Sequence, residues 1–525
     1  MTNEIKKNIG KLSLLLFGIN SAVGSGWLFG PFYSLKIAGP AASLSWILGG
    51  VMIIVIAAPF IVLCSSFPAS GGIIQYASIS QGVSVSRIVG WLTWLGTTFY
   101  QPIETQSALQ YSSHFFPGLF VNDRLTALGL LVATIIMLAL VLFNYFGIAL
   151  AKHVSNVLGG WKTIIPIVTI IVLFFDHFSL SNFSSHGGFM PFGMTGLLAA
   201  ISNGGILFSY VGFLGIVNIS AEVAKPKSTI PFGIIGSTIC IVIMYVALQT
   251  AFTGSLPAVS IHQGWQDMQV VGQTSPLVTL ASLLGLGWLA LLLYTDSVIS
   301  PVGAAFITTV ETARISYAIA EIGMVPKIMK KLNRYGVPHV SLIVNFVVSM
   351  LFFLPFHGWQ EMVSMIVSVQ ALTYAFGPIV MHIFYIYNKQ NHSKLRRLIY
   401  MGINLLSYYF SALLIYWSGW STVWHLTIFM GIVFFCLFVQ AMFRHKTLWP
   451  KEFSLGLWLI PYIAGMFLIS YLGDFGGTAK LSLQSSSVYI LLICVVTYVM
   501  AINIKLPKNL FKQRLSEFLA DHPVG

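Results

Sequence analysis

The sequence predicts an all-α polytopic membrane protein, from its charge content, its mean hydropathy and the length of its apolar runs. Only 8% of the 525 residues are charged, whereas a soluble domain carries about 25%. The mean hydropathy is +0.85, and the apolar runs are much longer than the roughly 10-residue alternating strands of an outer-membrane barrel. This composition excludes a soluble enzyme, a disordered chain and a nucleic-acid-binding protein.

A helix needs about 20 predominantly apolar residues to cross the hydrocarbon core of a bilayer. Fourteen runs meet or approach this length, the ninth being short, and we predict a transmembrane helix in each. In chain order the predicted spans are 12–35, 41–66, 86–114, 125–146, 154–175, 195–220, 231–254, 276–306, 339–356, 361–386, 398–417, 423–443, 454–473 and 487–504.

The basic residues are distributed unevenly over the segments between these spans. When residues 1–11 are placed in the cytoplasm as an N-terminal tail, 23 of the 27 lysines and arginines fall on the inner side. Only Lys36, Arg124 and Lys480 fall outside, and Lys162 lies within the fifth span. This positive-inside pattern predicts a multi-pass protein of the inner (plasma) membrane with a cytoplasmic C-terminal tail at 505–525. Contact between the inner loops and membrane lipid is a further expectation.

Two of the spans contain a candidate interruption. Gly24-Ser25-Gly26 lies in the middle of the first span, and Phe208–Gly212 lies in the sixth. Glycine permits backbone angles outside the helix, although close helix packing through small residues is an alternative explanation. Because the second interruption lies five spans after the first, the two helices cross in opposite directions. This is the expectation for an inverted repeat of five helices, in which two broken helices hold the substrate near the midplane.

At these positions the sequence resembles the amino acid–polyamine–organocation (APC) superfamily. The matching motifs are Gly24–Gly26, Phe67–Gly72 with Tyr76, Ala221–Pro226 with Pro231, and Ile322–Pro326 with Gly336 and Pro338. A second likeness, which covers almost the whole chain, is to the bacterial aspartate–proton symporter group. Its motifs are Gly71–Ile74, Leu284–Leu289, Tyr416–Trp420 and Ser470–Gly477.

The resemblance implies a LeuT-like fold with a 5+5 inverted repeat and broken helices 1 and 6. Residues 12–387 would form the ten-helix transporter core, with repeats at about 12–176 and 195–387, and residues 388–504 would add four transmembrane helices. Many relatives carry a carboxylate just after the break in the sixth span, where this chain has Leu214. The gating mechanism of those relatives is therefore in doubt for this protein.

The two interruptions supply candidate groups for binding an amino acid. The N-terminus of a half-helix offers free N–H groups and a partial positive charge, which suit a carboxylate. In the first span these groups belong to Gly24, Ser25, Gly26 and Trp27. Carbonyl groups freed in the sixth span suit an ammonium group. They belong to Phe208, Ser209, Tyr210 and Val211. Phe208 is also a candidate cover for the ligand, and ordinary packing is an equally good explanation.

Lys162 is the most informative ionisable residue because it lies within the fifth span. A charged lysine in hydrocarbon costs at least about 3 kcal/mol, so such a residue usually lines a cavity. Burial disfavours the charged form, which makes a lysine usable as a proton carrier. The alternative is a side chain that extends to the inner membrane surface. In proton-coupled relatives a lysine at the matching position takes the place of a sodium ion, so the resemblance favours protons over sodium.

Glu104 and Asp296 are the acids within predicted spans, in the outer halves of the third and eighth. Each is either a proton site or a structural acid that is satisfied by its neighbours. Glu222 and Glu311 lie closer to the ends of spans and are expected to contact the nearby Lys225 and Arg314. We therefore place Lys162, Glu104 and Asp296 in proton coupling.

These features predict a secondary active transporter that imports an amino acid by proton symport through alternating access. The alternatives are an uncoupled amino acid exchanger or antiporter and, from another class, a channel or a transporter-like sensor. The chain has no phosphate-binding loop and no nucleophile motif, so we expect neither enzyme activity nor ATP use nor a cofactor. The four cysteines and twelve histidines show no metal-ligand spacing, and we expect no metal.

The identity of the substrate and the oligomeric state do not follow from the sequence. The resemblance points to aspartate, yet no arginine lies in the interior of a predicted span to pair with a side-chain carboxylate. Backbone N–H groups or a polar side chain such as Asn20, Ser202 or Asn203 are the remaining possibilities, and the sequence does not choose among them.

Overall fold

A computed structural model describes most of the chain. The described residues are 9–69, 71–121, 124–146, 148–268, 275–356, 358–387, 394–444 and 454–521. Most of the predicted N-terminal tail at 1–11 and the last residues of the predicted C-terminal tail lie outside them, as do basic residues such as Lys6, Lys389 and Lys446 that support the predicted orientation.

Nearly all of the described secondary structure is helical, apart from one two-stranded hairpin. The elements of the first half are α1 (Lys11–Ala22), α2 (Gly26–Ala38), η1 (Gly39–Ala41), α3 (Ala42–Ser66), α4 (Gly72–Thr98), α5 (Tyr100–Ser112), η2 (Pro117–Leu119), β1 (Phe120–Val121), β2 (Arg124–Leu125), α6 (Ala127–Tyr145), α7 (Ile148–Asp176), η3 (Leu180–Phe183), α8 (Gly193–Asn203), η4 (Phe208–Tyr210), α9 (Gly212–Asn218), η5 (Ser220–Glu222) and α10 (Pro226–Gly254). The elements of the second half are η6 (Ala258–Ile261), α11 (Pro276–Leu283), α12 (Gly287–Glu321), η7 (Lys327–Lys330), α13 (His339–Leu351), α14 (Gly358–Tyr387), α15 (Lys394–Trp417), α16 (Trp420–Arg444), η8 (Ser454–Gly456), α18 (Leu459–Leu472), α19 (Leu483–Asn503) and α20 (Lys508–Asp521).

An α-helix lies in each of the fourteen predicted spans. By length and composition, ten segments of the described chain can cross a membrane. Helices suit this environment because they satisfy their own backbone hydrogen bonds where no water is present. The protein is therefore a multi-pass membrane protein, while fourteen crossings and the 5+5 repeat stay predictions.

Two predicted boundaries are wrong. The third span, predicted at 86–114, begins at Gly72 in α4 and continues through α5. The first turns of α4 contain too many polar residues to be counted as an apolar run. The helix also bends at Gly82, which has a φ of 87°, an angle that glycine adopts readily. The eighth span, predicted at 276–306, is divided between α11 and α12, and α12 runs to Glu321. The last turns of α12 are more polar than a hydropathy window allows, but they stay helical because α12 packs against α4 and α5.

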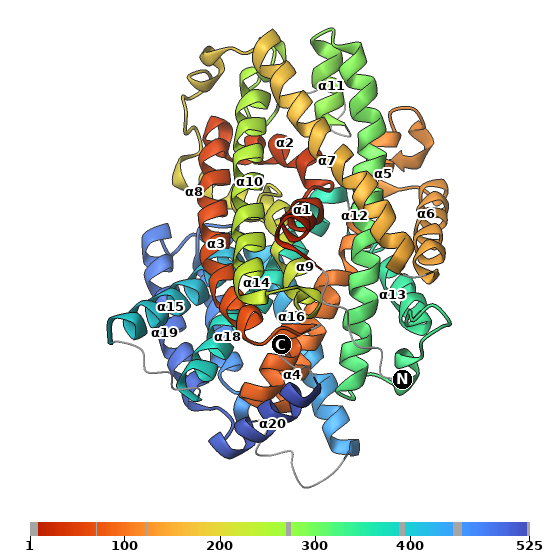
Figure 1. Cartoon of the computed structure of the whole chain (residues 1–525). Coiled ribbons are helices and arrows are strands. Elements are labelled where there is room, and N and C mark those ends of the chain that lie inside the picture. The colour runs from red at the N-terminus through yellow and green to blue at the C-terminus, as the bar shows by residue number, and fades with distance from the viewer. Residues whose placement is uncertain are drawn as a thin grey trace.

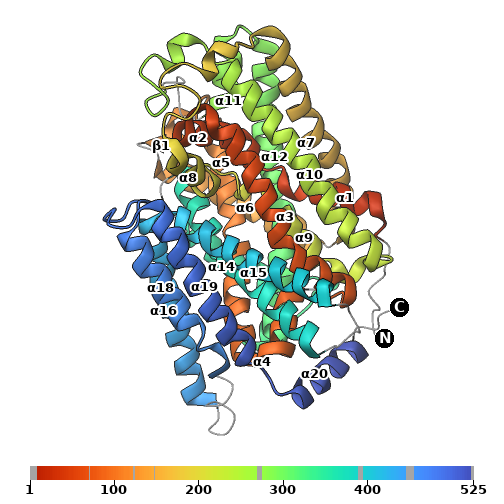
Figure 2. The same cartoon turned by 90° about the vertical axis from the view of Figure 1, so that its left-hand side faces the viewer.

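The long helices pack side by side around the two interrupted segments. α3 packs against α10, α5 against α12, and α4 against α14 (Figure 1). α16, α18 and α19 form a further layer beside α14 and α15 (Figure 2). The interrupted helices pack mainly on other helices formed by residues before 388, such as α7 and α10.

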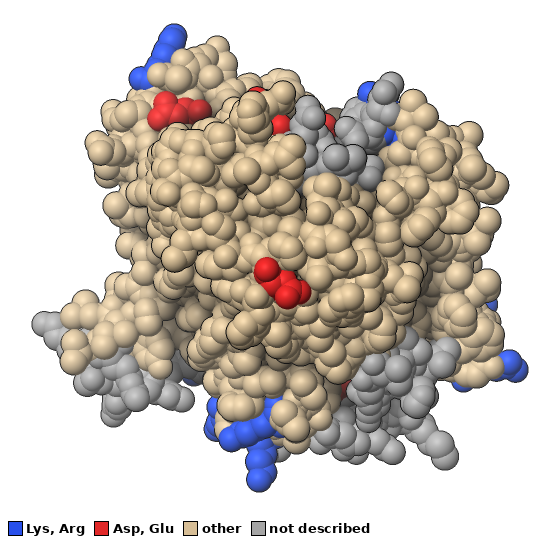
Figure 3. Space-filling view, turned by 90° about the horizontal axis from the view of Figure 1, so that it is seen from above, with Lys and Arg blue, Asp and Glu red and all other residues tan. Residues whose placement is uncertain are grey.

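The C-terminal helix α20 was not predicted, because the sequence analysis treated 505–525 only as a tail. It lies across the end of the bundle opposite to α11 (Figure 2). Its Phe511 and Phe518 rings pack against aromatic rings of α14 and α4, and Arg514 donates a hydrogen bond of 2.8 Å to the carbonyl oxygen of Ser78. At the other end of the molecule, which carries α11, most of the visible surface is uncharged (Figure 3).

Candidate functional site

The first predicted span is interrupted where the glycines indicated. α1 ends at Ala22 and α2 begins at Gly26, and Val23 between them has extended backbone angles. The first N–H groups of α2 have no partner within their own helix. Ser25 directly precedes α2, and its backbone amide donates a hydrogen bond of 2.8 Å to Oε2 of Glu104 on α5. A carboxylate of the protein's own chain therefore accepts from the start of α2, and the predicted binding of a substrate carboxylate there stays a prediction.

A second contact fixes Ser25 from the opposite side. The indole N–H of Trp359, at the start of α14, donates a hydrogen bond of 2.7 Å to the hydroxyl oxygen of Ser25. Both Ser25 and Trp359 are fully buried. The Trp359 ring stacks on Phe29 and Tyr33 with ring centroids 5.0 Å and 5.6 Å apart, so aromatic side chains cover this side of the break.

The sixth predicted span is also interrupted, because α8 ends at Asn203 and α9 begins only at Gly212. The two interruptions face each other. A Cβ atom added to Gly26 would overlap the hydroxyl of Ser209 and would lie 3.4 Å from the Phe208 ring. Phe208 stacks on Tyr100 at 5.4 Å and packs edge-on against Trp359 at 5.8 Å.

The remaining residues predicted around the second interruption have different surroundings. Tyr210 turns toward α3, where its hydroxyl donates to the carbonyl oxygen of Trp46 at 2.9 Å, and Val211 is buried. The polar residues Ser202 and Asn203 bond to carbonyl groups of α15, those of Leu414 and Trp417. Neither of these two side chains is therefore directed at the start of α2.

Lys162 does not extend toward the membrane surface. Its side chain is 1% exposed, and its ammonium donates a hydrogen bond of 3.2 Å to the carbonyl oxygen of Asn20, one turn before the break in the first span. Glu104 and Asp296 both act on it electrostatically, but neither forms an ion pair within 4.0 Å among the described residues. Lys162 thus connects α7 to the residues that end α1.

Asp296 is fully buried on α12 and accepts two hydrogen bonds at one oxygen. Trp161, the neighbour of Lys162, donates to Oδ1 at 2.8 Å, and Ser300 donates to the same atom at 2.7 Å. Within the described part of the chain Oδ2 has no hydrogen-bond partner. Asp296 therefore uses only one of its two carboxylate oxygens in hydrogen bonds, and one of its donors, Trp161, directly precedes Lys162 in the chain.

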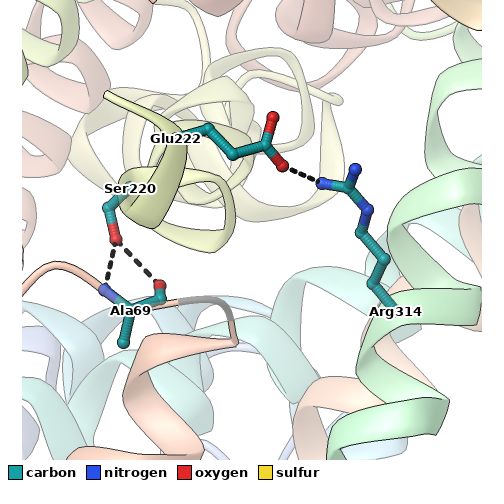
Figure 4. A network of polar contacts seen from close by, with 4 residues as sticks. All are labelled: Ala69, Ser220, Glu222 and Arg314. Atoms are coloured by element: carbon teal, nitrogen blue, oxygen red, sulfur yellow. Dashed lines mark hydrogen bonds and ion pairs between the residues drawn. The ribbon is translucent and has the colours of Figure 1, made fainter. Parts of the chain in front are cut away.

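Polar contacts also close the end of the bundle where the N-terminal segment lies. The hydroxyl of Ser220 accepts from the amide of Ala69 at 3.1 Å and donates to its carbonyl oxygen at 2.9 Å, while Arg314 pairs with Glu222 at 2.6 Å (Figure 4). Ile9 forms a β-bridge with Val223 beside them. These contacts join the segment after α9 to the loop after α3, to α12 and to the start of α1.

The sequence analysis missed three residues near the breaks. Trp359 lies between the ninth and tenth predicted spans, and Tyr100 lies in a mixed polar and apolar stretch of the third. No local pattern marks either residue as part of a site. Glu311 was expected near the end of a span in contact with Arg314, but it lies well inside α12 beside Gly215 of α9. The sequence held no clear signal for this position, because the hydropathy of the run does not reveal that the helix continues for 10 residues beyond Glu311, to Glu321. Among the described residues no group of acids, histidines and cysteines has the arrangement of a metal site.

An all-helical bundle in which two interrupted helices meet is the architecture of a membrane transporter. The fold is similar over 99% of the chain to the solved structure of Mhp1, a nucleobase-cation-symport-1 family transporter in a closed conformation with bromovinylhydantoin bound. The TM-score is 0.54, the identity is 10%, and 95% of that chain is covered. At this identity the likeness concerns the fold alone.

Two relatives from Bacillus subtilis (strain 168) cover nearly the whole chain. One is the glutamate/serine transporter AimA, 32% identical over 95% of this chain and 94% of its own length. Another is an aspartate-proton symporter, 34% identical over 90% of this chain and 91% of its own length. Residues 9–451 match the family model described as amino acid permease. The chain belongs to the amino acid permease family of the APC superfamily; it is an amino acid transporter and not an enzyme.

Proposed function

We propose that the protein imports an amino acid together with a proton by alternating access, and that Glu104 couples the two. The observation that carries this proposal is the hydrogen bond from the Ser25 amide to the Glu104 carboxylate. A substrate carboxylate suits the same amide, because the N-terminus of a helix favours negative charge. Glu104 and the substrate carboxylate therefore compete for one donor.

Protonation of Glu104 resolves this competition. A neutral carboxyl group is a weaker acceptor than a carboxylate, since charge-assisted hydrogen bonds are roughly twice as strong as neutral ones. When Glu104 takes up a proton, the Ser25 amide becomes available to the substrate, which binds as the proton does. Lys162 lies within electrostatic reach of Glu104 and Asp296, and so it senses the charge that either acid gains or loses.

The position of Lys162 supports a role in the conformational step. Its hydrogen bond to Asn20 ties α7 to the end of α1, and the start of α1 is bridged to the segment after α9. A change in the charge of Glu104 or Asp296 changes the cost of keeping a buried ammonium at this junction. We propose that this change is transmitted to the contacts between Ala69, Ser220, Glu222 and Arg314 that close the inner end (Figure 4).

The amide variants Glu104→Gln and Asp296→Asn test the coupling. Each keeps an oxygen that can accept the observed hydrogen bonds but cannot take up or release a proton. Glu104→Gln in liposomes is expected to keep exchange of substrate for substrate and to lower accumulation driven by a pH gradient at least about 10-fold. Asp296→Asn is expected to flatten the pH profile of uptake between about pH 5 and about pH 8.

The control is Glu517→Gln, the same chemical change on α20, where the carboxylate is exposed and bonds only Gln513 at 3.0 Å among the recorded contacts. It should leave both assays unchanged. Wild-type accumulation in Glu104→Gln and a wild-type pH profile in Asp296→Asn would remove these acids from the mechanism. An uncoupled exchanger would instead show exchange but no pH-driven accumulation in the wild type.

We further propose that the substrate has an oxygen-bearing side chain, with an acidic amino acid first and serine second. The relatives named for aspartate–proton symport and for glutamate and serine transport support this class. A binding screen of the common amino acids on the purified protein tests it. Aspartate or glutamate should give the largest thermal stabilisation, because ligand binding stabilises the folded state in proportion to RT ln(1 + [L]/Kd). A preference for basic or branched apolar amino acids would contradict it.

A further inference from the structure

Glu311 is a partly buried acid with a buried carboxylate oxygen, and the proposed function does not use it. It lies on α12, seven residues after Ala304, and Ala304 packs against Gly24 at the break in the first span. Seven residues of helix correspond to about 10 Å. Glu311 is therefore on the side of the break toward the contacts that close the end of the bundle near the N-terminal segment.

The surroundings of Glu311 come from three elements, α1, α9 and its own helix α12. A Cβ atom added to Gly215 of α9 would lie 3.0 Å from Oε1 of Glu311 and 2.9 Å from the hydroxyl of Ser21 on α1. Oε1 is buried and has no hydrogen-bond partner among the described residues. A buried polar atom without a partner is uncommon in a folded protein and calls for a functional or solvent partner. The location between α1, α9 and α12 is where the inner contacts would separate.

Tyr100 lies within electrostatic reach of both Glu311 and Glu104. Tyr100 begins α5, one turn before Glu104, and the hydroxyl of Tyr100 interacts electrostatically with Glu104, Glu311 and Tyr374 of α14. Its ring is held by stacking on Phe208. A hydroxyl both donates and accepts a hydrogen bond, so a tyrosine within electrostatic reach of both carboxyl groups is suited to pass a proton from one to the other through ordered water.

The charged neighbour of Glu311 is Arg314, three residues later on the same helix, a spacing that places two side chains on one face. Arg314 acts on Glu311 electrostatically, but its guanidinium forms its ion pair with Glu222 at 2.6 Å (Figure 4). Glu222 belongs to the segment after α9, which other hydrogen bonds tie to Ala69 and Ile9. While these contacts hold, Glu222 competes with Glu311 for Arg314.

We propose that Glu311 is the group from which the coupled proton is released to the cytoplasm, and that Arg314 triggers the release by exchanging Glu222 for Glu311 when the inner contacts open. This inference rests on the proposed proton symport. As Glu104 gives its proton to the hydroxyl oxygen of Tyr100, Tyr100 passes its own hydroxyl proton to the carboxylate of Glu311. One O–H bond breaks at Glu104, one forms at Glu311, and the tyrosine is unchanged. Arg314 then stabilises the Glu311 carboxylate, and the proton leaves to inner water.

The test uses the full-length protein in liposomes, with Glu311→Gln, Glu311→Asp and the control Glu321→Gln. Glu321 lies at the end of the same helix, with an exposed side chain and a long ion pair of 3.9 Å to Lys330. For Glu311→Gln, accumulation driven by a pH gradient should fall at least about 10-fold and should no longer depend on the pH inside the liposome, while substrate exchange continues. Glu311→Asp should restore part of the accumulation, and Glu321→Gln should behave as the wild type.

Each outcome decides between this inference and its alternatives. If the wild type shows no pH-driven accumulation, the proposed proton symport fails before Glu311 is tested. If the wild type accumulates substrate and Glu311→Gln does so equally, with the same dependence on inner pH, Glu311 is not the release group. If Glu311→Gln loses both substrate exchange and accumulation, Glu311 is a structural acid, and the inference is also overturned.

Discussion

Replacing Gly26 with valine is expected to weaken substrate binding strongly in a protein that still folds. The reason is the contact between the two interruptions: a Cβ atom at Gly26 would overlap the Ser209 hydroxyl and would approach the Phe208 ring to 3.4 Å. A valine carries two further methyl groups into the same space. Overpacking of a filled site costs about 1–3 kcal/mol, and about 1.4 kcal/mol corresponds to a tenfold change in affinity. The expected loss is therefore about 100-fold at the upper end of this range.

Thermal-shift titration of the purified variant with substrate measures this loss. Gly431→Val is the matched control, because Gly431 lies in α16 with nothing within 4 Å of an added Cβ atom. The control should bind as the wild type does. Wild-type affinity in a well-folded Gly26→Val variant would remove the assignment of the substrate carboxylate to the start of α2.

Replacing Lys162 with alanine is expected to eliminate uphill accumulation of substrate driven by a pH gradient, while substrate binding persists. The side chain is 1% exposed and donates a hydrogen bond to the carbonyl oxygen of Asn20. Its removal leaves the Asn20 carbonyl without this donor and takes away the positive charge that acts on Glu104 and Asp296. Breaking an interaction with a buried charge typically costs about 3–5 kcal/mol. We therefore expect a less stable protein with no coupling rather than a protein without a binding site.

Uptake into liposomes with an imposed pH gradient, with and without sodium, measures the effect of Lys162→Ala. Lys480→Ala is the control, since Lys480 is an exposed lysine between α18 and α19. Thermal unfolding of both variants separates lost coupling from lost folding. Retained accumulation in Lys162→Ala would exclude Lys162 from coupling. Dependence of the wild type on sodium would favour a different ion site.

The sequence determined the features that depend on neighbouring residues along the chain. Apolar runs of sufficient length predict helices wherever they occur, because lipid leaves the backbone no other partner, and each of the fourteen runs contains a helix. Gly24-Ser25-Gly26 predicted the first interruption because glycine tolerates angles that other residues do not. Lys162 was recognised because an isolated charge in an apolar run is costly anywhere in a membrane. The motifs at Phe67–Gly72 and Ala221–Pro226 predicted the family, which the match over residues 9–451 confirms.

Boundaries and contacts between distant helices required the tertiary structure. The polar end of α12 stays helical to Glu321 because it packs on α4 and α5, which no hydropathy window includes. Similarly, α20 forms after α19 and packs on the bundle through the rings of Phe511 and Phe518, which contact aromatic rings of α14 and α4. In both cases tertiary packing on distant helices adds to helical stability that a hydropathy window does not measure.

The chemistry of the site was decided in the same way. Glu104 is 79 positions from Ser25 in the chain, and Trp359 is 334 positions away, so nothing local indicates that both bond the same residue. The sequence showed that Glu104 and Lys162 are intramembrane charges, and only the packing of α5, α7 and α14 around the break placed a carboxylate, an ammonium and an indole there. Glu311 illustrates the limit most clearly. Its residue type and its nearness to Arg314 were visible, but the partner of Arg314 is Glu222 on another element. Which of two acids holds one guanidinium depends on distances of a few ångströms across the bundle, and these are set by how the helices pack and not by their order in the chain.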